Sequence, residues 1–257
     1  MSDLQFNRDA WDRIAARRDE YYLAASSAAI EKARSGIVEI KLTPTIKVPQ
    51  TWLGRLSGRD VLALASGGGL QGPLLAAAGA KTTVFDLSQG QLQRDLEVAG
   101  QFGMELKVLQ GDMQNLSCFE NESFDLIVNP CSICFCKNPT AIWHEIFRVL
   151  RPEGVFLTGL INPVNYLFDF FAAEKKQLNV RHCIPFEPDQ LDSDEQHRWL
   201  GDERPIEYGH SIDKLIGGQL QAGLVLTGFY EDRWGDEDLL CDHLPVFFAT
   251  RCIKKSN

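Results

Sequence analysis

The stretch Asp60–Gly72, which reads DVLALASGGGLQG, decides the fold. Residues 61–65 form a short, continuous apolar run, which is typical of a buried parallel strand. Glycines follow at once, and Pro73 suits the first turn of a helix because its missing N–H costs nothing there. The stretch therefore predicts a strand, a glycine-rich turn and a helix, whose N-terminal N–H groups can face a ligand.

The glycine spacing suggests a nucleoside ligand but leaves its identity open. Gly67, Gly69 and Gly72 satisfy G-x-G-x-x-G, a pattern associated with dinucleotides that is weak when it stands alone. Asp86 ends the next apolar run, TTVFD, where a carboxylate can accept hydrogen bonds from both hydroxyls of an adenosine ribose. On these residues a dinucleotide and S-adenosylmethionine fit equally well.

Apolar runs alternate with helical patterns over residues 60–160. The runs that predict strands are 61–65, 82–86, 105–112, 124–129 and 155–160. The predicted helices begin at Pro73, at Ser88, which can cap a helix through Phe102, and at Pro139. Strands and helices that alternate at these lengths predict an α/β fold with a doubly wound parallel sheet and right-handed crossovers.

The segments before residue 60 and after residue 160 do not continue this regular alternation of strand and helix. Residues 7–35 have a helical pattern in which Trp11, Ile14, Ala15 and Tyr22 share one face, and residues 36–59 are irregular. We therefore divide the chain into an N-terminal helical cap and connector (1–59) and a main domain (60–257) with an inserted cap (162–207). A helix at 211–222 and strands within LVLTGFYED and LPVFFATRCI should close the sheet, one of them antiparallel.

Composition excludes several classes of function. The chain has 257 residues and a formal net charge of −9, so an acidic surface disfavours a nucleic-acid partner. The first residues lack a signal-peptide pattern, and no apolar run approaches the roughly 18 residues that span a bilayer. We expect a cytoplasmic protein without a membrane partner.

The seven cysteines argue neither for a disulfide scaffold nor for a metal site. Their odd number in a long chain makes a secreted disulfide framework improbable. Cys131 and Cys134 form a C-x-x-C pair, but a structural zinc site usually needs a second spaced pair of ligands. We expect no metal and interpret these thiols as partly buried residues at a strand end.

The succession of motifs after the glycine turn resembles the class I S-adenosylmethionine-dependent methyltransferases. The motifs that carry the resemblance are VLALASGGG with Asp86, QGDM (110–113) with FDLIVNP (124–130), and RVLRPEGVFL (148–157). They cover residues 60–160 well and the terminal helix and strands, 211–252, reasonably. The run RVLRPEG is the most specific of them. Residues 1–40 and 162–207 match only in position.

The resemblance implies a seven-stranded, mostly parallel sheet with an antiparallel last strand and helices on both faces. It also implies an enzyme that binds S-adenosylmethionine and transfers its methyl group in line to a small-molecule acceptor. The residues that would bind the cofactor are Ala65, Ser66, Gly67 and Gly69 at the methionine portion, Asp86 at the ribose, Leu87, Asp112 and Met113 at the adenine, and Asn129 near the sulfonium.

One departure from the family pattern concerns the cofactor's ammonium group. The family usually has an acidic residue on the first strand where this chain has Ala63. The resemblance therefore leaves the ammonium group to backbone carbonyls or to side chains of the N-terminal cap.

The acceptor side is less well defined by the sequence. His210, which precedes the last helix, is a candidate for substrate contact or for a general base, against a surface or capping role. Tyr166 and Phe170 can line an acceptor pocket or pack in a core. Trp11 and Tyr22 can close over the cofactor as a lid or belong to a buried amphipathic face. Two other functions stay open: a nicotinamide-dependent oxidoreductase, supported by Gly72 and Asp86, and a non-catalytic S-adenosylmethionine-binding protein, suggested by Ala63.

Overall fold

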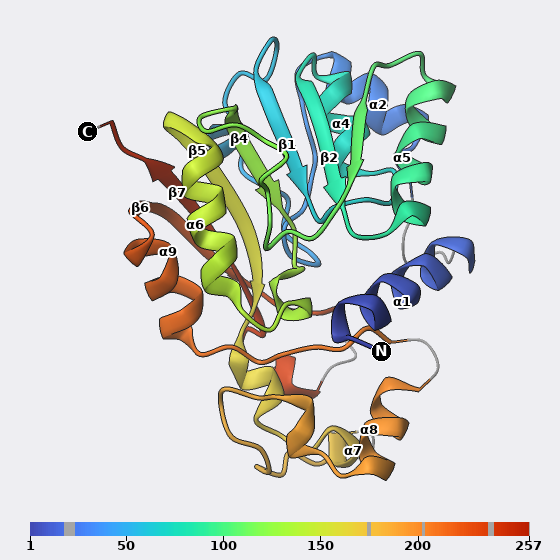
Figure 1. Cartoon of the computed structure of the whole chain (residues 1–257), viewed down its shortest axis with the longest axis vertical. Coiled ribbons are helices and arrows are strands. Elements are labelled where there is room, and N and C mark those ends of the chain that lie inside the picture. Colours follow the sequence, from blue (N-terminus) through green and yellow to red (C-terminus); the bar gives the residue numbers. More distant parts are fainter. Residues whose placement is uncertain (18–23, 174–175, 202–203, 236–238, 257) are drawn as a thin grey trace.

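A seven-stranded sheet runs through the residues that the computed structural model describes, which are 1–17, 24–173, 176–201, 204–235 and 239–256. Its strand order is β3-β2-β1-β4-β5-β7-β6 (Figure 1). The strands are β1 (Asp60–Leu64), β2 (Lys81–Asp86), β3 (Lys107–Gln110), β4 (Phe124–Asn129), β5 (Leu150–Ile161), β6 (Leu224–Asp232) and β7 (Phe247–Lys254). Only β7 runs antiparallel to its neighbours in this sheet, which confirms the predicted fold class.

Helices cover both faces of the sheet because side chains alternate along each strand. In β1, Val61 and Ala63 pack against one cluster of apolar side chains, and Leu62 and Leu64 pack against another. The first cluster contains side chains of α2 (Ser27–Arg34), α4 (Gln71–Ala77) and α5 (Gln89–Gln101); the second contains those of α6 (Pro139–Val149) and of the segment around α9 (Gly218–Gln221). Figure 1 shows the two helical layers on opposite sides of the strands.

Local signals at helix starts agree with the structure. The Ser88 side chain accepts a hydrogen bond from the Gln91 N–H and caps α5, which ends at the predicted place beside Phe102. Asn138 caps α6, and Pro139 occupies its first turn. Because these caps satisfy N–H groups that the helix itself leaves unpaired, they fix where the chain changes direction.

The N-terminal helical pattern was predicted as one segment, and the structure divides it. Residues 3–17 form α1 and residues 27–34 form α2, while Ser26 is extended and caps α2 through the Ala29 N–H. The side chain of Ser26 competes for that N–H and so starts a new helix. Tyr22 lies outside the described residues. The irregular connector contains one short helix, α3 (Gln50–Leu53).

Three element boundaries differ from the prediction. β3 occupies only Lys107–Gln110, and β5 begins at Leu150, because residues 150–154 continue the strand past an irregularity opposite β4. The helix predicted at 211–222 is a π-helical turn, Asp213–Gly217, followed by α9.

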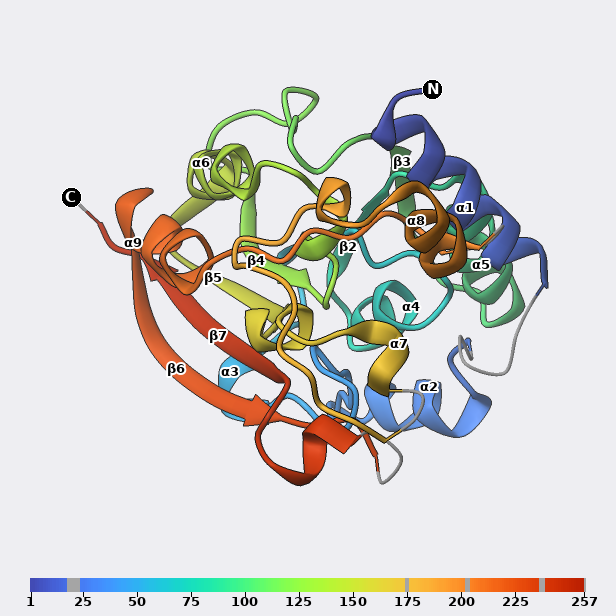
Figure 2. The ribbon, with the colours of Figure 1, turned by 90° about the horizontal axis from the view of Figure 1, so that it is seen from below.

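The segment 162–207 packs around aromatic side chains of its own. It contains α7 (Phe170–Ala173) and α8 (Ser193–Leu200), which lie beyond the carboxyl ends of the strands (Figures 1 and 2). Tyr166, Phe186 and Trp199 are buried in it. Side chains from residues 25–56 share the main core cluster with α4 and α5, and our division at residue 59 stays a prediction.

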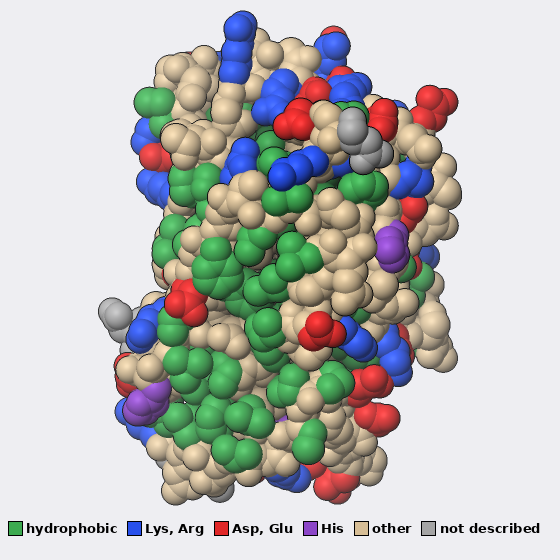
Figure 3. Space-filling view, turned by 90° about the vertical axis from the view of Figure 1, so that its left-hand side faces the viewer, with side chains coloured by type: hydrophobic (Ala, Val, Ile, Leu, Met, Phe, Trp, Pro, Cys, Tyr) green, Lys and Arg blue, Asp and Glu red, His purple; other side chains and the backbone are tan. Residues whose placement is uncertain are grey.

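One surface of the molecule carries many hydrophobic side chains. Figure 3 shows them across the middle and lower part of the side on which β6 forms the edge of the sheet. Phe229 on β6 is 47% exposed.

Candidate functional site

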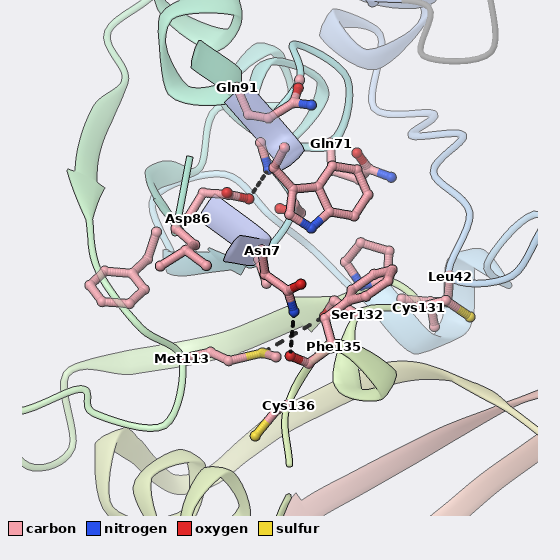
Figure 4. Close-up of a pocket in the computed structure, with 18 of the residues that line it drawn as sticks. Asn7, Leu42, Gln71, Asp86, Gln91, Met113, Cys131, Ser132, Phe135 and Cys136 are labelled. Atoms are coloured by element: carbon pink, nitrogen blue, oxygen red, sulfur yellow. Dashed lines mark hydrogen bonds between the residues drawn. The ribbon is translucent and has the colours of Figure 1, made fainter. Parts of the chain in front are cut away.

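A cavity of about 450 Å³ lies at the carboxyl ends of β1, β2 and β4. Its walls come from the glycine turn after β1, the end of β2, the loops 111–114 and 130–136, helix α1, the segment 41–44, Trp234 and Phe247. Figure 4 shows side chains from these distant parts of the chain converging on one space. In open α/β sheets this edge is the usual place for a ligand, where the strand order reverses next to the first strand.

Asp86 is built into the glycine turn. Its Oδ2 accepts a hydrogen bond from the Gly67 N–H at 2.9 Å (Figure 4). Its Oδ1 accepts one from the Ser88 N–H at 2.9 Å. Burial raises the pKa of the Asp86 carboxyl above its ordinary value, while these two N–H donors act in the opposite direction. The carboxyl group lines the cavity and keeps lone pairs for further hydrogen bonds.

A second carboxyl group, on α5, holds the rest of the turn. Asp95 is fully buried and accepts hydrogen bonds from the N–H groups of Gly68 at 3.0 Å and Gly69 at 3.1 Å. Burial raises its pKa to about 7. The N–H groups of residues 67–69 are therefore all donated to carboxyl oxygens of the protein and do not form a phosphate cradle. This arrangement disfavours a pyrophosphate and is compatible with a cationic ligand.

Two alanines lie near the start of the turn: Ala63 belongs to β1, and Ala65 follows the strand directly. Ala65 has φ +47°, a left-handed backbone conformation that alanine adopts only at a cost. It lines the cavity, whereas the Ala63 side chain is fully buried in the core cluster that contains α4. In this structure the side chain at position 63 therefore faces the core, where a carboxylate would need a partner.

The structure brings together seven of the nine residues predicted to bind the cofactor. The cavity is lined by Ala65, Ser66, Gly67, Asp86, Leu87, Asp112 and Met113. Asp112 accepts a hydrogen bond from the Gln114 N–H at 2.9 Å, which positions its carboxyl group in the loop after β3.

Gly69 and Asn129 are outside this lining as far as the described residues define it. Asn129 is fully buried and donates hydrogen bonds to Leu64 O at 2.9 Å and to Ser132 Oγ at 2.7 Å, while its Oδ1 accepts one from Thr158. These contacts join the ends of three neighbouring strands beneath the cavity.

The three residues predicted on the acceptor side lie elsewhere. His210 is buried, and its Nε2 donates a hydrogen bond to Cys136 O at 2.8 Å, while burial lowers the pKa of its imidazole. Tyr166 donates to Glu207 Oε2 at 2.8 Å, and Phe170 stacks on Trp199. None of the three is among the described residues that line the cavity, and their roles towards a substrate stay predictions.

Helix α1 adds side chains to the lining, of which the sequence analysis had named Trp11 but not Leu4 or Asn7. Leu4, Asn7 and Trp11 of α1 line the cavity, and Trp11 packs edge-to-face on Phe135 with ring centroids 5.1 Å apart. Asn7 donates hydrogen bonds to Phe135 O and Ile206 O, both at 3.1 Å. The apolar face of α1 pointed to Trp11, whereas no sequence signal marked Asn7, because its partner at residue 206 is distant in the chain.

The donor and acceptor pattern of the cavity fits S-adenosylmethionine. Besides Asp86 and Asp112, the lining contains Ser66 Oγ and Gln91 Oε1, buried oxygens that have no hydrogen-bond partner within the part of the chain that the structure describes. Acceptors of this kind match the hydroxyl and ammonium donors of the cofactor, and carboxylates match its positive charge. Among the described residues no cluster could hold a metal ion, and no helix is long and apolar enough to span a bilayer.

Comparison with known proteins identifies the family. Residues 62–158 match the family described as a methyltransferase domain. The uncharacterized methyltransferase YbaJ of Bacillus subtilis (strain 168) is 39% identical over 249 residues, which cover 96% of this chain and 97% of that protein.

Solved structures agree on the fold. An S-adenosylmethionine-dependent methyltransferase from Mesorhizobium loti is 14% identical, with a TM-score of 0.63, covering 79% of this chain and 94% of that one. A putative enzyme of the same kind from Listeria monocytogenes is 18% identical, with a TM-score of 0.58, covering 80% and 96%. Together with the seven-stranded sheet and the acceptor-rich cavity, the relative that matches almost the whole length shows that this chain belongs to the class I S-adenosylmethionine-dependent methyltransferases.

Proposed function

We propose that the chain transfers the methyl group of S-adenosylmethionine to a small-molecule acceptor by in-line displacement. In this proposal the methionine portion lies along Ala65, Ser66 and Gly67, Asp86 accepts hydrogen bonds from the ribose, and the loop at Asp112 and Met113 contacts the adenine. When bound, the cofactor supplies a sulfonium methyl group, which is an intrinsically strong alkylating group.

The observation that carries the proposal is that carboxyl groups of the protein accept the hydrogen bonds from the backbone N–H groups of the glycine turn. Asp86 and Asp95 accept all three N–H groups of residues 67–69, so these groups are already paired, and Asp86 lines the cavity with its carboxyl group. A nicotinamide dinucleotide would find these N–H groups already taken and would bring its pyrophosphate near the Asp86 carboxyl group, which is electrostatically unfavourable. A cationic sulfonium compound needs no N–H donors and is favoured by a carboxylate at Asp86.

The apolar part of the lining supports a small, largely apolar acceptor. Besides the residues proposed for the cofactor, the lining contains the hydrophobic side chains of Leu4, Leu42, Phe135, Trp234 and Phe247. Walls of this kind, closed on one side by α1, exclude water and orient a nucleophile towards the methyl group. The volume of about 450 Å³ is within the range of about 300–1,000 Å³ that is typical of small-molecule sites.

The described lining residues other than the two carboxyl groups assigned to the cofactor, Asp86 and Asp112, include no histidine and no thiol with a lowered pKa that could serve as a general base for the acceptor. No histidine is among the described lining residues. Burial raises the pKa of the Cys136 thiol to about 12 and that of Cys131 well above its usual range, so both stay protonated at neutral pH. The lining therefore suits an acceptor whose nucleophilic atom needs no protein base. The acidic net charge supports the further proposal that nucleic acid is not the acceptor.

A calorimetric titration with S-adenosylhomocysteine tests the cofactor site. Asp86→Ala removes a charged acceptor of the ribose hydroxyls, and we expect affinity to fall by about 100-fold or more, since hydrogen bonds to charged groups are worth about 1.5–3 kcal/mol each. Asp60→Asn is the matched control, because that carboxylate pairs with Arg151 at the amino end of β1. Wild-type affinity in Asp86→Ala would place the ribose elsewhere.

A further inference from the structure

Two buried oxygens in the cavity wall lack a donor. Ser66 is 4% exposed and Gln91 is 3% exposed, and no donor among the described residues reaches Ser66 Oγ or Gln91 Oε1. Buried acceptors are normally paired, because an unpaired one has lost its water and gained nothing in return. Since both residues line the same cavity, the missing donors can come from a ligand.

The two oxygens lie at different places along the turn. Ser66 follows Ala65 directly, at the part of the turn proposed for the methionine portion. Gln91 belongs to α5 and flanks Gly67 together with Asp86: a Cβ built on Gly67 would lie 2.8 Å from Gln91 Cβ and 3.1 Å from Asp86 Cγ. Figure 4 shows Gln91 and Asp86 next to the same turn. The base of the Gln91 side chain therefore lies on the same side of the turn as the Asp86 carboxyl group, and its Oε1 lies 3.0 Å from where a Cβ on Gly68 would be.

We propose that Ser66 Oγ accepts a hydrogen bond from the cofactor's ammonium group and that Gln91 Oε1 accepts one from a ribose hydroxyl. This inference rests on the proposed placement of the cofactor. Ala63 provides no carboxylate for the ammonium group, and Ser66 is the nearest residue along the chain with an unpaired side-chain acceptor. At Gln91 a neutral acceptor is favourable, because a further carboxylate beside Asp86 and Asp95 would add repulsion.

Two ligands separate the two roles. 5′-Methylthioadenosine has the same nucleoside as S-adenosylhomocysteine but lacks the amino-acid tail. We expect Ser66→Ala to weaken S-adenosylhomocysteine by about tenfold and to leave 5′-methylthioadenosine unchanged, since only the first ligand has an ammonium group. Gln91→Met keeps the length of the side chain, and we expect it to weaken both ligands by the same factor, about three- to tenfold.

The controls keep this test apart from that of the proposed function. Ser132→Ala removes another hydroxyl of the lining, one that already accepts a hydrogen bond from Asn129, and it should not discriminate between the ligands. Thermal unfolding verifies that each variant is folded, and Ser66→Cys replaces Ser66→Ala if the latter is not. Wild-type protein that binds neither ligand would refute the cofactor site itself. Tight wild-type binding with equal losses for both ligands in the Ser66 variant would overturn this inference alone.

Discussion

Asp95 shows how a single buried side chain decides what the glycine turn can bind. Its carboxyl group takes the N–H groups of Gly68 and Gly69, which would otherwise be available to a phosphate. Glycine is required at position 69 by φ +86° and by the approach of the Arg94 backbone, 3.1 Å from where a Cβ would lie. The glycine pattern that resembles a dinucleotide motif therefore serves here to bring the backbone close to α5.

The titration of Asp95 predicts a pH dependence of stability. Its pKa is raised from 3.8 to about 7 in the folded protein, so the folded state binds more protons than the unfolded state between these values. The contribution of this group to the free energy of unfolding is thus complete below about pH 4. It declines as pH rises to about 7, by at most on the order of 4 kcal/mol. Urea unfolding at several pH values should show this decline in wild type and its absence in Asp95→Asn.

Asn at position 95 keeps one of the two oxygens that accept the N–H groups of Gly68 and Gly69, so we expect the variant to fold with a lower but less pH-dependent stability. Glu105→Gln changes an exposed carboxyl group in the loop after α5 and should follow the wild-type curve. A constant difference between wild type and Asp95→Asn from pH 4 to pH 8 would contradict the raised pKa.

At the scale of elements, α1 lines one side of the cavity and is attached to other segments by hydrogen bonds, among them the one that Asp3 accepts from the Tyr208 hydroxyl. Asn7 bonds to the loop at Phe135 and to Ile206, and Asp12 accepts hydrogen bonds from Ser88 Oγ and the Gly90 N–H at the start of α5. Between these points Trp11 lines the cavity. We therefore predict that movement of α1 limits the release of a bound ligand.

Asn7→Ala tests this prediction. The substitution removes three buried hydrogen bonds, including the one that Asn7 Oδ1 accepts from the Ile206 N–H, and leaves the side chains of the cofactor wall untouched. We expect S-adenosylhomocysteine to dissociate about tenfold faster, measured by stopped-flow fluorescence, because α1 loses about 1–2 kcal/mol of attachment. Gln5→Ala, which removes a contact within α1 to Asp9, should keep the wild-type rate. An unchanged rate in Asn7→Ala would show that these bonds do not control release.

At the scale of the whole molecule, the cavity joins segments from both ends of the chain, so its ligand should stabilise the complete fold. Its lining includes α1 near the N-terminus, the turn after β1, and Phe247 on the last strand. A ligand that binds only the folded state adds about 2.7 kcal/mol at a concentration 100 times its Kd.

Thermal unfolding measures this coupling. In a chain of this size about 2.7 kcal/mol corresponds to a rise in Tm of roughly 5–10 °C, which we expect with S-adenosylhomocysteine. NADH at the same concentration should leave Tm unchanged, because the N–H groups of the turn are already paired and its pyrophosphate would lie near the Asp86 carboxyl group. A larger rise with NADH would favour the oxidoreductase alternative.

The sheet and most of the cofactor wall were predictable because their signals are local. The continuous run at residues 61–65, Ser88 as a helix cap and Asp86 at a strand end all act within a few residues of themselves. The N-terminal pattern was misjudged as one segment, since the break at Ser26 depends on a cap that competes only weakly with helical periodicity.

By itself, the sequence determined the alternation of strands and helices, because apolar periodicity and helix caps set the order of the elements. This order in turn determined the edge of the sheet at which the glycine turn and Asp86 meet. Only the tertiary structure decided that Asp95 closes the turn to phosphate and that Asn7 and Trp11 line the cavity. It also placed Tyr166 and Phe170 in the core of the inserted segment. Those outcomes depend on contacts between residues far apart in the chain. Burial and hydrogen bonding between such residues produce no periodic pattern in the sequence from which they could be predicted.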